Sequence, residues 1–145
     1  DEITWLVVMP YAFSLVGLAV WSFLGDRFNV RSLVAGVGFV GAALAISIAL
    51  RAENLAVVIA CMTAAVFCIS AFAATEYALI QRIFPMDNFG PAMGLYNGLT
   101  SLVGGGLGPA LMSPLIGDGS GTWLISVVAL LTASLLLLYF RLVRY

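Results

Sequence analysis

A single carboxyl group, that of Glu76, stands well inside an apolar stretch of this sequence. A carboxyl group in apolar surroundings can take up and release a proton near neutral pH, so one role open to Glu76 is proton coupling. The other role is structural, because the side chain can also reach toward a basic group. The basic groups expected nearby are Arg82, Arg27 and Arg31. The residues alone leave both roles open.

Three charged residues, Asp26, Arg27 and Arg31, stand close together in the segment FLGDRFNVR between two apolar stretches. Arginine is typical of the anchors at the cytoplasmic face of a membrane. That role does not account for Asp26, nor for Gly25 and Asn29, which are typical of turns. The segment therefore predicts a tight charged connection that anchoring alone does not explain.

Uncharged polar side chains on the apolar stretches are candidates for a substrate path. Tyr11 and Ser14 lie one helical turn apart, and a second pair, Asn97 and Ser101, shares one helix face at four-residue spacing. An amide or hydroxyl there can bind a carboxylate or a sugar hydroxyl without carrying charge. The alternative is hydrogen bonding between helices, which such residues supply routinely in membranes. Further candidates are Ser70, Thr75, Tyr96 and Thr100.

The composition indicates that lipid is the solvent of this chain. Of its 145 residues, 63% are hydrophobic and 9% are charged, and the mean hydropathy is +1.12, whereas about one-quarter of a soluble domain is charged. The net charge of −1 indicates no nucleic-acid partner. Cys61 and Cys68, seven residues apart on one helix face, are expected to be packing residues. Without histidine, clustered cysteines or a nucleophile beside a base, we expect no metal, no cofactor and no enzyme.

Five apolar stretches must position these side chains, each near or above the ~20 residues with which a helix crosses a bilayer. They comprise residues 3–24, 32–50, 55–83, 91–116 and 123–140. In lipid every backbone polar group must be bonded internally, so each stretch should be a helix. The sequence therefore predicts an all-α, polytopic membrane helix bundle with five transmembrane helices.

Residues typical of helix ends stand at the breaks between these stretches. Ser32, Asn54 and Thr122 are each expected to cap the helix that follows. Pro85 should end the third stretch, and Pro91 should lie in the first turn of the fourth. Prolines inside the stretches should kink or shorten their helices, and these are Pro10, Pro109 and Pro114.

Glycine recurs at four-residue spacing along the fourth stretch. The glycines concerned are Gly90, Gly94 and Gly98, followed by Gly104 and Gly108. Such a stripe lets another helix approach closely, so we expect helix packing there. The second stretch offers the same feature through Gly36, Gly38 and Gly41.

Basic residues orient the predicted bundle. Five spans place the two termini on opposite faces, and cytoplasmic loops carry the excess of basic residues. Only Arg51 belongs to the N-terminal face. The C-terminal face would carry Arg27, Arg31, Arg82, Arg141 and Arg144. We therefore expect a multi-pass integral protein of a bacterial inner membrane or a plasma membrane, with its C-terminus in the cytoplasm.

The charged connection resembles a loop of the major facilitator superfamily. In that loop Gly, a few variable residues, Asp, Arg, a second Gly and basic residues follow the second helix of each six-helix half. The segment SFLGDRFNVR keeps Asp26, Arg27 and Arg31 of this pattern. It departs from the pattern at Ser22 and Asn29, where the family usually has Gly.

Two further stretches resemble the anion:cation symporter branch of that superfamily, namely MPYAFSLVG at 9–17 and IFPMDNFGPAMGLYNGLTSLVGGGLGPAL at 83–111. In the second, the branch has Phe-Pro before a loop, then Gly, Ala, Gly and Asn, and a Gly-rich run that ends in Gly-Pro. The residues that fit are Phe84, Pro85, Gly90, Ala92, Gly94, Asn97, Gly105, Gly108 and Pro109. Phe89 stands where the branch usually has Arg.

The resemblance covers essentially the whole chain. It implies helices eight to twelve of a twelve-helix transporter, a partial C-terminal half, with the N-terminal half and helix seven preceding Asp1 in the same protein. It further implies a secondary active transporter, an ion-coupled symporter of small organic anions such as sugar acids or other carboxylates, which works by alternating access. Its partners would be membrane lipid, that small-molecule substrate and a coupling ion. Asp26, Arg27 and Arg31 would then form a cytoplasmic gate.

A different class of function stays open beside the transporter. The chain could be a stand-alone five-span membrane scaffold or subunit that docks a partner through its Gly-rich helix faces. The sequence preceding Asp1 distinguishes the two, because only the transporter requires seven further helices there.

Overall fold

The computed structural model describes residues 2–107, 110, 127–128, 130–135 and 137–138. Its helices are α1 (Glu2–Arg27), α2 (Arg31–Ala49), α3 (Leu55–Ile83) and α4 (Phe89–Thr100), with the short 3-10 helix η1 (Met86–Asn88) and the π-helix η2 (Ser101–Leu107). No strand occurs among the described residues, and the predicted all-α fold class is confirmed.

Three helical segments are long and apolar enough to cross a membrane. They are Val8–Arg27 of α1, Arg31–Ala49 of α2 and Leu55–Ala78 of α3. The fourth predicted stretch, 91–116, contains most of α4 and all of η2 and then passes beyond the described residues. Of the fifth stretch, 123–140, the structure describes residues 127–128, 130–135 and 137–138, all of them helical, whereas Arg141 and Arg144 lie outside the described residues.

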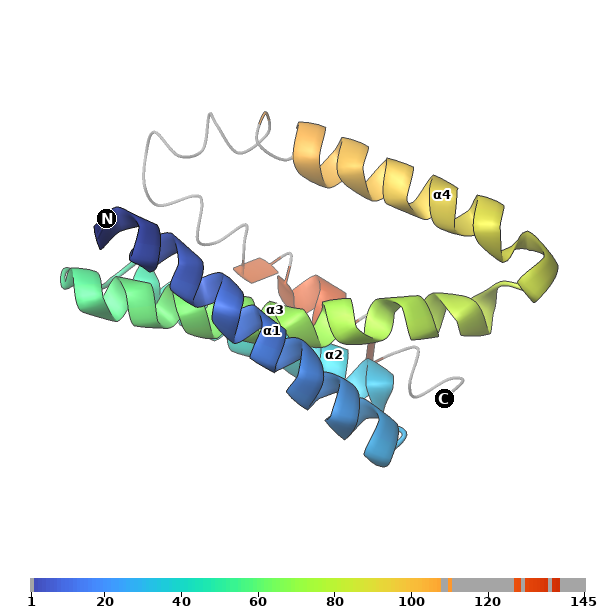
Figure 1. Cartoon of the computed structure of the whole chain (residues 1–145), viewed down its shortest axis with the longest axis horizontal. Coiled ribbons are helices and arrows are strands. Elements are labelled where there is room, and N and C mark those ends of the chain that lie inside the picture. The colour runs from blue at the N-terminus through green and yellow to red at the C-terminus, as the bar shows by residue number, and fades with distance from the viewer. Residues whose placement is uncertain (1, 108–109, 111–126, 129, 136, 139–145) are drawn as a thin grey trace.

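Helix α3 is the centre of a three-helix bundle. Helix α2 packs along it most extensively and α1 next, whereas α1 and α2 contact each other much less. Figure 1 shows the three helices side by side, so that the end of α1, the start of α2 and the end of α3 lie at the same end of the bundle. Within the described chain, 50% of the α2 span is buried but only 11% of the α1 span. Most of α1 therefore faces outward.

Small residues allow the backbones of α2 and α3 to meet. A Cβ atom added to Gly38 would lie 2.5 Å from the Ala71 Cβ and from the Cys68 carbonyl oxygen, and one added to Gly41 would lie 2.8 Å from the Cys68 Sγ. The Cys68 carbonyl group is backbone and cannot move aside, so the approach requires glycine at position 38, whereas at position 41 the Cys68 side chain would have to shift. The predicted packing role of these α2 glycines is confirmed. Both cysteines carry free thiols, and Cys68 packs against the two glycines.

The contact between α1 and α3 combines close approach with hydrogen bonds. Gly17 lies against Phe67 and Ser70, to which an added Cβ would come within 3.0–3.1 Å. On one side of it the Ser14 and Ser70 hydroxyls share a hydrogen bond of 2.8 Å. On the other, the Trp21 indole N–H donates to the Phe67 carbonyl oxygen over 3.0 Å. The seam is thus fixed by polar contacts that need no water, as a helix pair in lipid requires.

The predicted helix ends are partly right. Asn54 caps α3, since its Oδ1 accepts a hydrogen bond of 2.9 Å from the Ala56 amide. The prediction for Ser32 is wrong, because α2 already begins at Arg31, its N-cap is Val30 without a side-chain bond, and Ser32 is buried within the helix. The physical reason is the tightness of the turn, in which Asn29 takes a φ of 50° and the chain enters α2 at once. Thr122 lies outside the described residues.

The prolines have different effects on the helices. α1 continues through Pro10, so this proline does not shorten its helix, and the alternative, a kink, stays a prediction. A proline removes one backbone donor, and a long helix in a bundle retains the rest. After Pro85, η1 and α4 begin, with Pro91 two residues after the first residue of α4. Pro109 and Pro114 lie outside the described residues.

We expect Gly38→Ala to make the full-length protein that contains this chain less stable than Gly36→Ala does. Both changes remove the same cost of glycine in a helix, which is about 1 kcal/mol. The new methyl group at position 38 would collide with the Cys68 carbonyl group, whereas at position 36 its nearest neighbours would lie at 3.7 and 3.8 Å. Overpacking of this kind costs roughly 1–3 kcal/mol.

The thermal unfolding midpoint in detergent, followed by tryptophan fluorescence, measures the difference between these two variants. A lower midpoint for Gly38→Ala than for Gly36→Ala is the expected result. Equal midpoints would contradict the close contact between α2 and α3.

Candidate functional site

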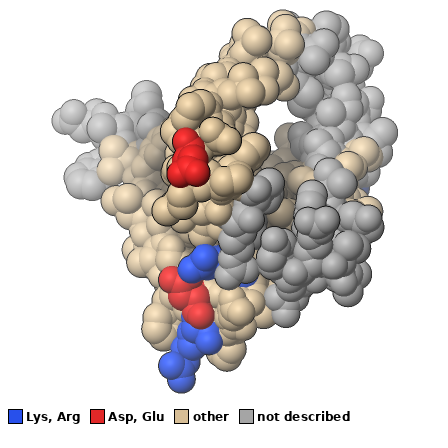
Figure 2. All heavy atoms as spheres, turned by 90° about the vertical axis from the view of Figure 1, so that its right-hand side faces the viewer, with Lys and Arg blue, Asp and Glu red and all other residues tan. Residues whose placement is uncertain are grey.

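The charged side chains of the described chain gather mainly at one end of the bundle. Asp26 and Arg27 lie in the last turn of α1, Arg31 begins α2, and Asp87 lies in η1 just after α3. Figure 2 looks onto this end and shows acidic and basic groups close together on its surface, with one acidic group apart from them. This end is where the sequence placed its candidate gate.

Asp26 and Arg31 form an ion pair at this end. The Arg31 Nη2 lies 2.8 Å from the Asp26 Oδ1, and the Arg31 Nε donates to the same oxygen over 2.9 Å. The turn between α1 and α2 brings them together, because the Val30 amide donates to the Gly25 carbonyl group and Asn29 takes the left-handed conformation. Gly25 is buried, and a Cβ added to it would lie 3.4 Å from the Arg31 Cγ. The aliphatic stem of Arg31 therefore passes over a position without a side chain.

The exposure of this pair limits its strength. The Asp26 side chain is 62% exposed and that of Arg31 28%, and surface ion pairs contribute about 0–1 kcal/mol. Arg27, the third predicted gate residue, is exposed. The site is thus a weak and reversible contact rather than a rigid one.

Glu76 has a partner that the sequence analysis did not assign. Its Oε2 accepts a hydrogen bond of 3.2 Å from the Tyr96 hydroxyl of α4, and both side chains are half-buried. Of the basic partners that the sequence suggested, Arg31 pairs with Asp26 instead, and the side chain of Arg82 lies outside the described residues. Among the described residues, the partner of Glu76 is therefore a neutral hydrogen-bond donor, the Tyr96 hydroxyl.

A sequence signal for this contact does exist. Glu76 and Tyr96 each stand ten residues from Met86, the first residue of the short helix that follows Pro85. When two helices fold back on each other, residues equally far from the turn lie opposite one another. Polar residues placed symmetrically about a proline turn are therefore candidates for a contact.

The glycine stripe of α4 is open in the described structure. A Cβ atom added to Gly90, Gly94, Gly98 or Gly104 would meet nothing within 4 Å, and Gly108 lies outside the described residues. No residue of α4 is buried, and Figure 1 shows α4 running back along the bundle without lying on it. The expected packing of another helix against this stripe stays a prediction.

The candidate substrate-path residues are not gathered at one place. The Ser14 hydroxyl forms a hydrogen bond with the Ser70 hydroxyl, as expected if such residues bind neighbouring helices instead of substrate. Tyr11, Asn97 and Ser101 are exposed. Thr75 is buried and donates to the Ala71 carbonyl oxygen over 2.9 Å. The substrate-path role of these residues stays a prediction.

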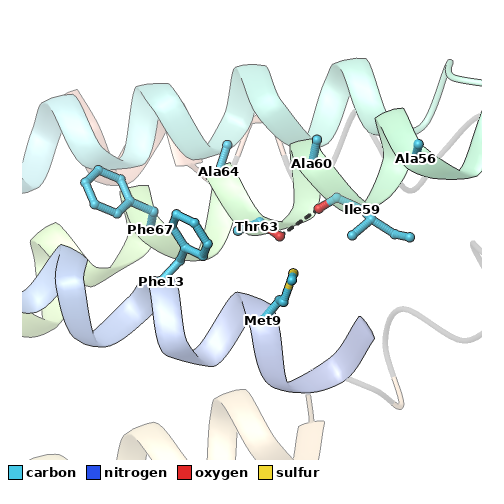
Figure 3. Close-up of a pocket in the computed structure, with 8 residues that line it drawn as sticks. All are labelled: Met9, Phe13, Ala56, Ile59, Ala60, Thr63, Ala64 and Phe67. Atoms are coloured by element: carbon cyan, nitrogen blue, oxygen red, sulfur yellow. Dashed lines mark hydrogen bonds between the residues drawn. The ribbon is translucent and has the colours of Figure 1, made fainter. Parts of the chain in front are cut away.

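An apolar groove between α1 and α3 is a feature that the sequence analysis missed. It has a volume of about 680 Å³, and Met9 and Phe13 of α1 face the first half of α3 across it (Figure 3). The polar side chain in its lining, that of Thr63, donates to the Ile59 carbonyl oxygen over 2.8 Å. A sequence signal was available in Ala56, Ala60 and Ala64, which stand four residues apart. The groove suits an apolar occupant.

Comparisons with known proteins agree with this architecture. The family model of the Major Facilitator Superfamily matches residues 1–145, the whole chain. Neither the curated proteins nor the solved structures gave a match. No cluster of three or more potential metal ligands occurs in the part of the chain that the structure describes. With three membrane-length apolar helices and a match over its full length, the chain belongs to the major facilitator superfamily of membrane transporters.

Proposed function

We propose that this chain forms helices eight to twelve of a secondary active transporter that moves small organic anions, such as sugar acids or other carboxylates, together with a coupling ion. Membership of the family supports transport. The observation that carries ion coupling is Glu76, which lies in the span Leu55–Ala78 with the neutral Tyr96 as its described partner. A carboxyl group so placed exchanges a proton without breaking an ion pair.

The Asp26–Arg31 pair supports the proposed cytoplasmic gate. It ties the end of α1 to the start of α2 across a turn of three residues, while the exposed Arg27 is free to reach toward the other half of the transporter. Such a gate must open in every transport cycle, which suits a contact worth about 0–1 kcal/mol. The excess of arginine at this end supports its cytoplasmic location, and a cytoplasmic C-terminus, in a bacterial inner membrane or a plasma membrane.

Exposed polar groups support a substrate path along α1 and α4. Tyr11, Asn97 and Ser101 present hydroxyl and amide groups outward, where they would face a cavity completed by the N-terminal half. The sequence holds no arginine near the middle of a predicted span. The cation that meets an anionic substrate would therefore come from the N-terminal half.

A second candidate function is a stand-alone scaffold or subunit. The observation in its favour is the open glycine stripe of α4, against which another helix could pack. The natural coding sequence before Asp1 separates the two proposals. Seven further spans, with a second Asp-Arg connection after the second of them, are expected for the transporter. A start codon just before Asp1, with no further span, would support the scaffold instead.

In liposomes that hold the full-length protein, we expect Glu76→Gln to abolish accumulation of a labelled sugar acid driven by an imposed pH gradient. Downhill exchange of the same compound should continue, because the amide keeps the shape of the side chain but binds no proton. Glu53→Gln, which changes an exposed carboxyl group at the opposite end of α3, is the matched control and should behave as the wild type. If Glu76→Gln still accumulates the compound with unchanged pH dependence, the role of Glu76 is structural.

Exchanging the charges of the gate pair tests the second proposal. Asp26→Arg or Arg31→Asp alone should lower the initial uptake rate several-fold at equal amounts of protein in the membrane, because two like charges then face each other across the turn. The double variant restores an ion pair of opposite polarity and should recover most of the rate. If the single variants transport at the wild-type rate, the Asp26–Arg31 pair is not part of the gate.

A further inference from the structure

The hydrogen bond between Tyr96 and Glu76 joins two parts of the chain that otherwise contact each other little. Helix α3 packs closely on α1 and α2, whereas the contacts of any extent that α4 makes in the described chain are with its neighbours η1 and η2. Within the described residues, the hydrogen bond of 3.2 Å from the Tyr96 hydroxyl to the Glu76 Oε2 therefore links α4 to the bundle.

The contact lies far enough from the turn to govern the position of α4. Tyr96 stands seven residues after Phe89, the first residue of α4, which is about 10 Å along the helix axis at about 1.5 Å per residue. No residue of η1 or α4 is buried, so few packing contacts hold α4 at its angle to the bundle. A single contact at that distance from the turn limits the angle between α4 and α3.

The charged and titratable groups around Glu76 are few in the described chain. From α1 and α2, the charged side chains at this end are Asp26, Arg27 and Arg31, of which Asp26 and Arg31 pair with each other. From α4 the group is Tyr96, and on α3 itself it is the neighbouring Tyr77, which is 48% exposed. Tyr96 is therefore the group that responds most directly to the charge on Glu76.

We propose that Tyr96 is a positioning residue through which the charge on Glu76 sets the position of α4 relative to α3. The proposal rests on the reversible protonation of Glu76 that the proposed function requires. An ionised carboxylate accepts a charge-assisted hydrogen bond from the phenol, which is roughly twice as strong as a neutral one. When a proton from the solvent binds Glu76, the bond becomes a neutral one and α4 is held less tightly. Release of that proton draws α4 back to α3.

A distance measurement between α1 and α4 tests this. Spin labels at the exposed positions Val16 and Leu99, in full-length protein whose native cysteines are replaced by alanine, report the separation by pulsed electron paramagnetic resonance. In lipid nanodiscs the wild-type distance distribution should narrow as the pH rises and Glu76 ionises. Tyr96→Phe should give the broad distribution at every pH. Glu76→Gln should give one distribution that does not change with pH.

Tyr77→Phe is the matched control, because it removes the neighbouring phenol on α3 and should keep the wild-type pH dependence. Glu76→Asp is a second test should Tyr96→Phe fail to fold. Its shorter side chain withdraws the carboxylate from Tyr96, so the distribution should broaden at high pH. The proposal would be overturned if the wild-type distance distribution did not change with pH. It would also be overturned if the distribution of Tyr96→Phe changed with pH as that of the wild type does.

The transport assay separates this proposal from proton coupling itself. If the pH gradient drives accumulation but Tyr96→Phe changes neither accumulation nor the distance, the positioning role of Tyr96 fails and the proposed function stands. If the pH gradient drives no accumulation while the distance still follows pH through Tyr96, the contact sets the position of α4 and the proton coupling fails.

Discussion

Direct approach of the α2 and α3 backbones is the constraint on which the rest of the described structure depends. Lipid supplies no hydrophobic force to press two apolar helices together, so they associate through close packing and hydrogen bonds. Gly38 and Gly41 provide the required space, since Cys68 of α3 fills the position that their side chains would take. This contact fixes α3, and α3 in turn carries Ser70, which binds α1, and Glu76, which binds α4.

Polar groups divide into two populations around this core. Those within the three-helix bundle are satisfied by the chain itself, as with the Ser14–Ser70 pair and the bond from Thr75 to the Ala71 carbonyl group. No buried side-chain nitrogen or oxygen without a partner occurs among the described residues. The exposed polar groups of α4 and η2, such as Asn97 and Ser101, belong to the second population. The bundle is therefore a self-contained support, and α4 is the element that presents polar groups outward.

The residues predicted the fold class because lipid leaves the backbone one choice within an apolar stretch of about 20 residues. Asn54 was predictable as a cap because its side chain acts on an amide two residues away. Ser32 was not, because the start of α2 depends on how tightly the chain turns at Asn29. Within the site, Asp26 and Arg31 are five residues apart and their pairing is local. The Tyr96 contact depends on α3 and α4 folding back on each other, which apolar composition does not reveal and which only the equal distances of Glu76 and Tyr96 from the turn indicate.

The π-helix η2 that follows α4 affects which way its own last residues face. Residues Ser101–Leu107 form bonds to the fifth residue along rather than the fourth, so this segment holds more residues per turn than an α-helix. If the same seven residues took α-helical bonding, each would turn the chain further, and Leu107 would come to lie on a different side of the helix relative to α4. The bonding pattern of this glycine-containing segment therefore determines the direction that Leu107 faces relative to α4.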